Sequence, residues 1–355
     1  MRRRKSTIAL GAGAVILIAA AAVLRFAVVP VLAQVPSDLD ATARYAGTAS
    51  LLDSAALEGG DSENLFIQDL PVTASQRVQV TGTDGGTAVA SEDLVMRDPD
   101  GEKIRDTHHV YAIDRKDLNA EQPPAGSHAE KHEGLSVGFP LEPEKTDYPF
   151  WDATTQDTSP AKYRETTSTE GRETYVYEFQ HSGTVADPAT VKALPEALSK
   201  AAVQALAAGL PAAGREEVTA VLPELADPVA LTYTAEVDTT FTVDTETGVP
   251  LHTVKAQQVT ANIDGPEGPM PLFDVLSYEL ESTPESVEER VQDASDAARL
   301  LSLAGNVIPL ALILAGALLT VAAVWTARRG GGSGTAAPDA AAESRDVPEE
   351  ESEPV

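Results

Sequence analysis

Cysteine is absent from the 355 residues of the chain. Its absence excludes disulfides, thiolate nucleophiles and any metal or iron–sulfur site that depends on cysteine ligands. A fold exported to an oxidising compartment must then be stabilised by its core alone. Stabilisation by the core alone is feasible for a domain of about 270 residues, because folding buries roughly 70–75% of the surface that the unfolded chain exposes.

Basic residues are few, with 26 Lys and Arg against 55 Asp and Glu and a formal net charge of −29. Several of these basic residues flank two apolar segments: Arg2–Lys5 precede the first, and Arg328 and Arg329 follow the second. The acidic excess therefore falls on the region between the segments. Because such a surface repels phosphates, we expect no nucleic acid partner.

Sequence signatures of catalysis are also lacking. The chain contains no Gly-x-Ser-x-Gly elbow, no phosphate-binding glycine loop and no His-Glu-x-x-His helix. Its many carboxylates, such as Asp152 and Asp157, are equally well explained as solvated acids. We therefore expect a protein that is not an enzyme, with no catalytic residues and no cofactor. An envelope hydrolase is the alternative, because catalytic sites can lack local motifs.

His128 and His132, in the stretch SHAEKHEG, are the candidate metal ligands. On a helix, two histidines four residues apart share a face and can hold zinc. Two prolines and a glycine precede this pair, and Gly134 follows it, which favours a solvated loop. A third ligand is also missing, so we expect no metal site.

Long apolar runs are present, and the first is Ile8–Leu24. Counted from Ser6, it extends about 28 Å as a helix, enough to cross the hydrocarbon core of a bilayer. The sequence VLA before Gln34 is similar to a cleavage site, which leaves cleavage after Ala33 open, but the run exceeds the ~7–15 residues of a signal peptide. We expect a retained signal-anchor helix over 6–29, after a cytoplasmic N-tail of residues 1–5.

The second apolar run, Val307–Ala327, contains no charged residue and extends about 31 Å as a helix. It has no polar face, which excludes the buried helix of a soluble protein. Trp325 and the following arginines fit the cytoplasmic interface. We expect a second transmembrane helix over 306–327, both termini in the cytoplasm and the bulk of the chain outside the plasma membrane. The composition of 328–355 predicts a disordered acidic cytoplasmic tail.

The region 34–283 is predicted to be an extracytoplasmic β-rich domain. Its clearest signal is LTYTAEVDTTFTV, where Leu231 and Tyr233 begin a period-two apolar row that reaches Val243. DTETGVP supplies a turn, and a second strand follows over 251–263. Similar alternation occurs in ETYVYEFQ and around the turns DGGT and DPDG. The expected fold class is mainly β (α+β), a twisted antiparallel sheet or sandwich with one or two helices.

Two helices are predicted in addition to the spans. One covers 195–208, with Pro195 at its first position and Gly209 as its stop, and is expected to pack across the sheet. The other covers 284–304 and is capped by Thr283. Its apolar stripe predicts an amphipathic stalk that leads directly into the second span.

One aromatic cluster, in GFPLEPEKTDYPFWD, contains one of only two tryptophans. Large rings bury much area, so the simplest interpretation is a plug at one end of the core, with the indole N–H bonded to an acceptor such as Asp152. The alternative is an exposed platform that faces a ligand. The candidate structural or ligand-facing residues are Tyr148, Phe150, Trp151 and Asp152.

Three stretches resemble a known family: LRFAVVPVLAQVPSDLDATARYAGTASLLD after the first span, HEGLSVGFPLEPEKTDYPFWDATTQDTS, and FTVDTETGVPLHTVKAQQVT. The second contains Gly-Leu-Ser and Tyr-Pro-x-Trp-Asp elements. Together they are similar to an actinobacterial membrane-protein family of unknown function, also catalogued as the porin PorA family. The resemblance implies a double-anchored cell-envelope protein of actinobacteria, and it supplies no catalytic or binding residues.

The leading hypothesis is a non-enzymatic extracytoplasmic module that binds an apolar or lipid ligand, or an envelope protein. The hairpin VDTETGVPLHTVKAQQ resembles, more loosely, the strand–turn–strand of lipoprotein-carrier half-barrels. An open apolar cavity is then expected between the sheet and the helix over 195–208. The alternative is a porin or channel component, although the strands lack the all-round apolar face of a membrane barrel and the spans lack a polar stripe.

Overall fold

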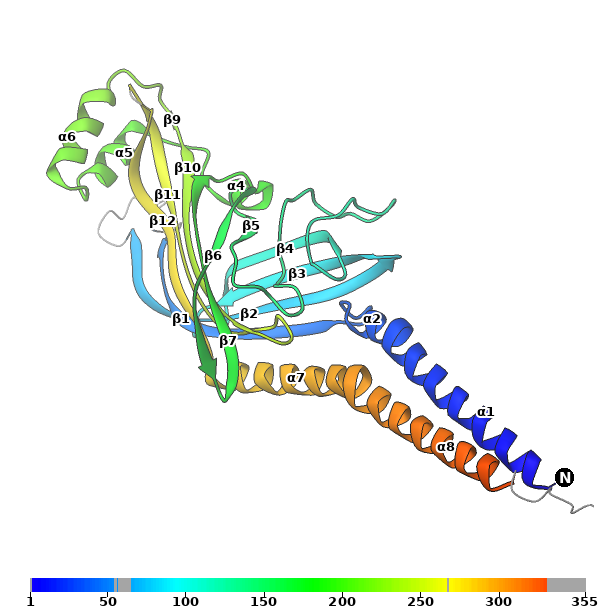
Figure 1. Cartoon of the computed structure of the whole chain (residues 1–355). Helices are drawn as coiled ribbons and strands as arrows, with labels where there is room; N and C mark the ends of the chain where they lie inside the picture. The colour runs from blue at the N-terminus through cyan, green and yellow to red at the C-terminus, as the bar shows by residue number, and fades with distance from the viewer. Residues whose placement is uncertain (1, 54–55, 57–64, 267, 331–355) are drawn as a thin grey trace, which may run out of the picture. The chain divides into compact units, whose positions relative to one another are not determined.

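The computed structural model describes residues 2–53, 56, 65–266 and 268–330 (Figure 1). The chain forms two compact units, one of residues 1–27 with 304–355 and the other of residues 28–303. The disordered tail was predicted over 328–355; its first three residues, 328–330, are instead the end of a helix, and residues 331–355 lie outside the described part of the chain.

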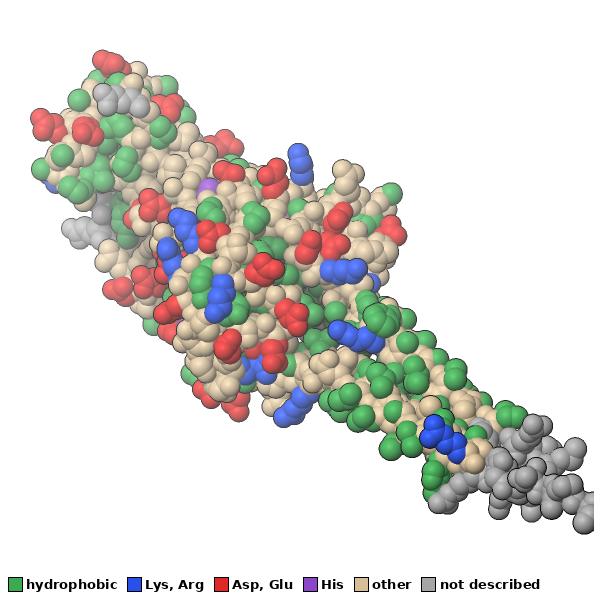
Figure 2. All heavy atoms as spheres, in the orientation of Figure 1, with side chains coloured by type: hydrophobic (Ala, Val, Ile, Leu, Met, Phe, Trp, Pro, Cys, Tyr) green, Lys and Arg blue, Asp and Glu red, His purple; other side chains and the backbone are tan. Residues whose placement is uncertain are grey.

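The first unit contains two long helices, α1 (Arg2–Val23) and α8 (Ile308–Gly330). They pack through small residues: Ala14 and Ala21 are buried, and a Cβ added to Gly316 would lie 3.2 Å from the backbone oxygen of Ala14. Helical segments at Ile8–Leu32 and Pro284–Arg328 are long and apolar enough to cross a membrane. Figure 2 shows hydrophobic side chains along the visible face of this unit. The basic residues assigned to the N-tail are already helical, because α1 begins at Arg2.

The second unit is built on one ten-stranded antiparallel sheet, in the order β4-β3-β2-β1-β12-β11-β10-β7-β6-β5. The mainly β prediction is confirmed, and the sheet curves on itself instead of forming the two layers of a sandwich (Figure 1). Its strands are β1 (Asp40–Leu52), β2 (Phe66–Asp84), β3 (Thr87–Arg97), β4 (Lys103–Asp114), β5 (Tyr148–Asp152), β6 (Asp157–Thr169), β7 (Arg172–Thr184), β10 (Thr232–Asp244), β11 (Pro250–Gly265) and β12 (Gly268–Ser282).

The predicted hairpin is present as β10 and β11, joined at the turn DTETGV. Tyr233, Ala235 and Phe241 point to the same face and are buried, as the period-two pattern predicts. Antiparallel register extends such rows across the sheet, so that Arg105, Met96, Ala74 and Tyr45 lie side by side on β4, β3, β2 and β1. These rows make up the inner face of the curved sheet.

The segment 115–147 joins the two opposite edges of the sheet. β4 and β5 follow one another along the chain but lie at the two ends of the strand order. The backbone N–H of Glu130 donates to the carbonyl of Val110 on β4 (2.6 Å). The N–H of Leu135 donates to Pro149 (2.8 Å), and that of Trp151 donates back to Leu135 (2.8 Å). The connection thus pairs both sheet edges that would otherwise be exposed and closes the curved sheet.

Gly134 is a critical point of this closure. Its φ is +68°, and an added Cβ would lie 2.4 Å from the backbone oxygen of Pro149. Gly171 has a similar φ of +82° but open space around it. Gly171→Ala is therefore expected to cost about 1–2 kcal/mol from backbone strain alone, and Gly134→Ala clearly more. Urea unfolding of both variants checks this, and equal midpoints would show that the docking of 115–147 contributes nothing.

Two short helices, α5 (Lys200–Ala207) and α6 (Ala212–Val221), cover one end of β10–β12 (Figure 1). A third, α4 (Pro188–Ala193), precedes them in the chain, and the two-residue strands β8 (Ala197–Leu198) and β9 (Val229–Ala230) pair with one another. The prediction that Pro195 starts a helix is wrong. Ser199 is the N-cap, its hydroxyl accepting from the N–H of Ala202 (3.2 Å), and the residues before it form β8.

Where an open cavity was expected between the sheet and 195–208, the described side chains form a buried core cluster. Side chains of α5 and α6 pack on the sheet in a filled cluster whose members are each less than a tenth exposed. They include Val203, Leu206, Val218, Val259 and Ile263. This contact is ordinary core.

The helix predicted from the Thr283 cap is α7 (Pro284–Ser302), which continues through a π-helical turn (Leu303–Val307) into α8. α7 lies against the sheet. The hydroxyl of Ser286 accepts from the N–H of Arg44 (2.9 Å), and Arg290 donates to the carbonyl of Thr42 (2.5 Å).

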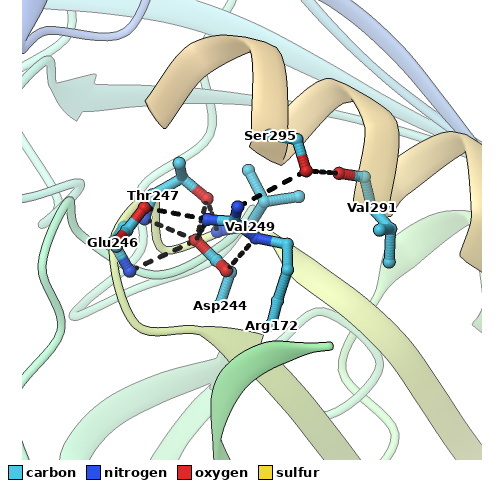
Figure 3. A network of polar contacts seen from close by, with 7 residues as sticks. All are labelled: Arg172, Asp244, Glu246, Thr247, Val249, Val291 and Ser295. Atoms are coloured by element: carbon cyan, nitrogen blue, oxygen red, sulfur yellow. Dashed lines mark hydrogen bonds and ion pairs between the residues drawn. The ribbon is translucent and has the colours of Figure 1, made fainter. Parts of the chain in front are cut away.

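A second attachment of α7 is centred on Arg172, at the start of β7 (Figure 3). Its guanidinium makes two hydrogen bonds to the carboxylate of Asp244, at 2.6 and 3.0 Å. It also donates to the hydroxyl of Ser295 on α7 (3.4 Å). Thr247 donates to the same Asp244 carboxylate through both its N–H and its hydroxyl. This network joins β7, the β10–β11 turn and α7.

A candidate ligand cavity inside the curved sheet

A cavity of about 800 Å³ lies inside the curved sheet of the second unit. Its walls are the inner faces of β1–β4 and β10–β12, the segment 136–141 and one side of α7. Ligand sites in proteins have volumes of about 300–1,000 Å³ and are mostly apolar. The lining is mostly apolar here too, and includes Val78, Leu94, Phe139, Phe179, Phe241 and Leu251.

The predicted aromatic cluster contributes to one wall. Phe150 is buried, faces the cavity and lies 5.0 Å, centroid to centroid, from Phe241. Trp151 is half-buried and also lines the cavity, whereas Tyr148 packs edge-on against Phe139. Asp152 accepts from the N–H and hydroxyl of Thr155, at 2.8 and 2.7 Å, and so closes the turn after β5. The cluster is therefore partly core and partly cavity wall.

A group of polar residues interrupts the apolar wall. Lys255, on β11, donates from Nζ to Oε1 of Gln76 on β2 (2.5 Å) and lies 5.3 Å from the ring centroid of Tyr45. The Tyr45 hydroxyl donates to the same Gln76 oxygen (3.0 Å), and the Gln76 amide donates to Glu92. Burial lowers the pKa of Lys255 below its ordinary value, an effect that the nearby Glu92 carboxylate only partly opposes.

Arg105, on β4, is the second cation of this polar group. Its Nη2 donates to the hydroxyl of Thr154 (3.4 Å), and its guanidinium carbon lies 5.9 Å from the ring centroid of Tyr278. Gln257 connects Thr154 and Tyr278, two residues that contact Arg105: it donates to the Thr154 hydroxyl (2.9 Å) and accepts from the Tyr278 hydroxyl (2.6 Å).

Sequence reasoning missed these polar residues, although a signal was present. Lys255 and Gln257 occupy the same phase of the β11 alternation as Leu251, Val259 and Ile263, which are buried. A charged residue in the apolar phase of a strand marks an inward-facing polar group.

His132 was expected in a solvated loop and is instead buried. Its ring lies between Tyr111 and Trp151, at centroid distances of 4.8 and 6.3 Å, and burial lowers its pKa. Nearby, His109 contacts Glu130 (3.1 Å); burial opposes its charge, but the Glu130 hydrogen bond and carboxylate raise its pKa overall. Within the described residues, no group of three potential ligands that could hold a metal is found.

The sheet also carries an open groove of about 770 Å³, which shares lining residues such as Val237, Gln257 and Tyr278 with the inner cavity. Its lining is polar and acidic, and includes Glu236, Asp238 and Glu279. Figure 2 likewise shows acidic side chains distributed over the visible face of this unit. Among the described lining residues of the groove, Tyr278 is the one Phe, Tyr or Trp, whereas several such residues line the inner cavity.

Comparison with protein families matches residues 5–325 to the porin PorA family. The chain belongs to this family. Two helices that could span a membrane, in a member of the PorA family, indicate a membrane protein. Comparison with curated proteins gave no match.

Among solved structures, this PorA-family chain has weak similarity to the peroxisomal multifunctional enzyme type 2 from Drosophila melanogaster, with 14% identity, 69% of this chain and 37% of that chain covered, and a TM-score of 0.14. It has similar likeness to a conserved hypothetical protein with a double hotdog fold from Mycobacterium tuberculosis (12% identity, 76% and 80% covered, TM-score 0.15). It is also weakly similar to an acyl-CoA thioesterase II from Mycobacterium marinum, with 11% identity, 68% of this chain and 80% of that chain covered, and a TM-score of 0.13. Such TM-scores carry no argument about fold or function.

Proposed function

We propose that this PorA-family chain is a double-anchored envelope protein whose β-rich unit binds the acyl chain of a lipid without catalysing a reaction. The observation that carries the proposal is the mostly apolar cavity of about 800 Å³ inside the curved sheet. An acyl chain in this cavity would make dispersion contacts with its apolar lining.

The energetics fit a lipid acquired from a membrane. Burying about ten methylene groups from water is worth about 8 kcal/mol, which corresponds to a Kd of about 1 μM before the costs of association. Transfer from a bilayer offers no such gain, because the chain is already in hydrocarbon. Binding in competition with a membrane therefore requires contacts to the polar part of the lipid, and the cavity has polar residues to make them.

The chain termini of the β-rich unit support access from a membrane. Leu32 lines the cavity at the start of this unit, and Leu300 and Leu301 line it at the end. In sequence, Leu32 ends one candidate span, and Leu300 and Leu301 lie in the long helix that contains the other. With Arg2–Lys5 and Arg328–Arg329 on the cytoplasmic side, both termini are cytoplasmic and the cavity is extracytoplasmic.

The family name suggests a second function, a channel. Within the described residues, the β-sheet has an acidic open groove, where a lipid-facing barrel would need an apolar band. We therefore expect the purified chain to give no conductance in planar bilayers. Reproducible single-channel steps, absent in mock preparations, would support the channel and contradict a pure binding role. Turnover in an unbiased hydrolase screen would likewise contradict the non-enzymatic assignment.

Trp151 provides the direct test. In a Trp325→Phe variant of the full chain in phosphatidylcholine nanodiscs, Trp151 is the one remaining tryptophan and lines the cavity. Dibromostearate is expected to quench its fluorescence saturably, because bromine quenches on contact, and unbrominated stearate should reverse the quenching by competition. Quenching that only rises linearly with the bromolipid content of the bilayer would show that no chain enters the cavity.

A further inference from the structure

The inner cavity has an unusual charge for this chain. Acidic residues outnumber basic ones by 55 to 26 overall, yet the cavity lining holds as many cations (Arg105, Arg115, Lys116, Lys255, Arg290) as carboxylates (Asp38, Asp40, Glu92, Asp152, Asp293). Arg105 and Lys255 lie on strands of the sheet that line this cavity. Among the described residues, neither cation has a carboxylate within ion-pair distance, whereas exposed arginines such as Arg77 and Arg164 do.

Arg105 has donors without acceptors. Nη2 makes one long hydrogen bond, to Thr154 (3.4 Å), and Nε is buried with no partner. A guanidinium has five N–H donors in a planar arrangement that matches a carboxylate or a phosphate. Leaving such donors buried and unpaired is unfavourable, and an anionic oxygen in the cavity would satisfy them.

Lys255 is similarly short of a counterion. Gln76, a neutral amide, accepts its hydrogen bond, and the amide group of Gln76 is the partner of Glu92. Burial lowers the pKa of Lys255, Glu92 and Tyr278 oppose this, and the positive charge of Arg105 lowers it further. Geometry also brings the two cations near one another: both line the cavity, and Arg105 lies 5.9 Å from the ring centroid of Tyr278, whose hydroxyl donates to Gln257, two residues along β11 from Lys255. An anion between them would compensate both charges.

We propose that Arg105 and Lys255 form the headgroup subsite of the cavity and bind an anionic carboxylate or phosphate carried by an acyl-chain amphiphile. This inference rests on the proposed lipid binding and adds the chemical class of the headgroup. The apolar walls then hold the chain, and Gln76, Gln257 and Tyr45 surround the anion with further polar groups.

The test compares ligands that share a chain and differ in charge. Dibromostearic acid and its methyl ester are titrated into the Trp325→Phe chain in nanodiscs at pH 8.5, with concentrations expressed as mole fraction in the bilayer. The acid is expected to bind at least tenfold more tightly than the ester. Arg105→Gln should weaken binding of the acid roughly ten- to a hundredfold, since charged hydrogen bonds are lost, and change binding of the ester less than twofold.

Control variants separate charge from folding. Arg105→Lys keeps a cation and should retain most of the preference for acid over ester, and Lys255→Gln should reduce it independently. Arg164→Gln removes an exposed arginine paired with Glu178 and should leave both ligands unaffected. If Arg105→Gln does not fold, the same comparison of acid and ester binding is made with Lys255→Gln.

Each outcome is decisive. If the Trp325→Phe chain binds the acid and the ester equally well, the proposed anion subsite is wrong, but the proposed lipid binding is still supported. Failure of both ligands to quench would overturn the proposed function itself. A lysophosphatidate that competes with the acid at equal or lower mole fraction identifies phosphate as the better anion. Displacement of the acid by millimolar inorganic phosphate, without effect on the ester, would show that a free anion occupies the same subsite.

Discussion

Asp244→Ala is expected to lower the free energy of unfolding of the β-rich unit by about 3–5 kcal/mol, because it removes the buried carboxylate partner of Arg172 and leaves only the exposed Glu246, at 3.1 Å. The Asp244 side chain is 1% exposed and that of Arg172 is 16% exposed. The substitution removes both hydrogen bonds to the guanidinium and also the acceptor for the turn residue Thr247. Because Arg172 also donates to Ser295, α7 should loosen from the sheet.

Urea unfolding of the Trp325→Phe chain, followed by Trp151 fluorescence, measures the loss. The matched control is Asp40→Ala, which removes an equally bidentate partner of Arg77 at a site where both side chains are 45% exposed. Surface pairs of this kind contribute about 0–1 kcal/mol. A loss for Asp244→Ala no larger than for Asp40→Ala would show that the network does not hold α7.

The same pair predicts a pH dependence with a definite sign. Burial alone would raise the pKa of Asp244, but the hydrogen bonds from Arg172 and Thr247 lower it below its ordinary value. A carboxyl with a lowered pKa in the folded state stabilises the fold above its unfolded pKa, about 4, and this contribution is lost as the pH falls through the folded pKa. The difference between the parent chain and Asp244→Ala should therefore be full at neutral pH and shrink below about pH 4.

Thr107→Phe is expected to weaken lipid binding at least tenfold while leaving the fold intact. Thr107 lies on β4 between Arg105 and His109 in the inward phase, is half-buried and lines the cavity. A phenyl group there occupies space in the cavity, and each methylene that the ligand can no longer bury is worth about 0.8 kcal/mol. Loss of two methylene contacts is enough for a tenfold effect.

The measurement is bromostearate quenching of Trp151, with Thr167→Phe on the exposed part of β6 as the control. Both variants should unfold at urea concentrations close to that of the parent. At position 107 the cavity has room for the new ring, and at position 167 the ring lies on the exposed surface. Unchanged quenching by Thr107→Phe would place the ligand elsewhere on the chain.

Local patterns in the sequence were enough to predict several of the strands and the long helices, but not β1, β5, β6 or β12. Period-two alternation identified β10 and β11, and two long runs with few or no charged residues identified α1 and α8. These elements could be predicted because their formation depends mainly on residues that are close together in the chain. The start of α5 was mispredicted because two helix-initiating signals, Pro195 and Ser199, lie close together. The pairing of 197–198 with 229–230, which is long-range, decides between them.

The cavity depends on contacts that the sequence does not reveal. Within segment 115–147, the stretch around His128 and His132 was expected to be a solvated loop because prolines and glycines flank it. The segment is ordered instead, because both edges of the sheet offer it backbone partners, at Val110 and Pro149. The burial of His132 follows from that docking. The inward position of Lys255 could be read from strand phase, but its meeting with Gln76, far away in sequence, could not.

Native mass spectrometry of the full chain released from nanodiscs prepared with native lipid extract tests the central claim most directly. The account predicts one acyl-chain lipid retained per chain, anionic in its headgroup, and absent from the Thr107→Phe variant prepared in parallel. A parent chain that is consistently lipid-free, or that retains the same lipids as Thr107→Phe, would contradict the account.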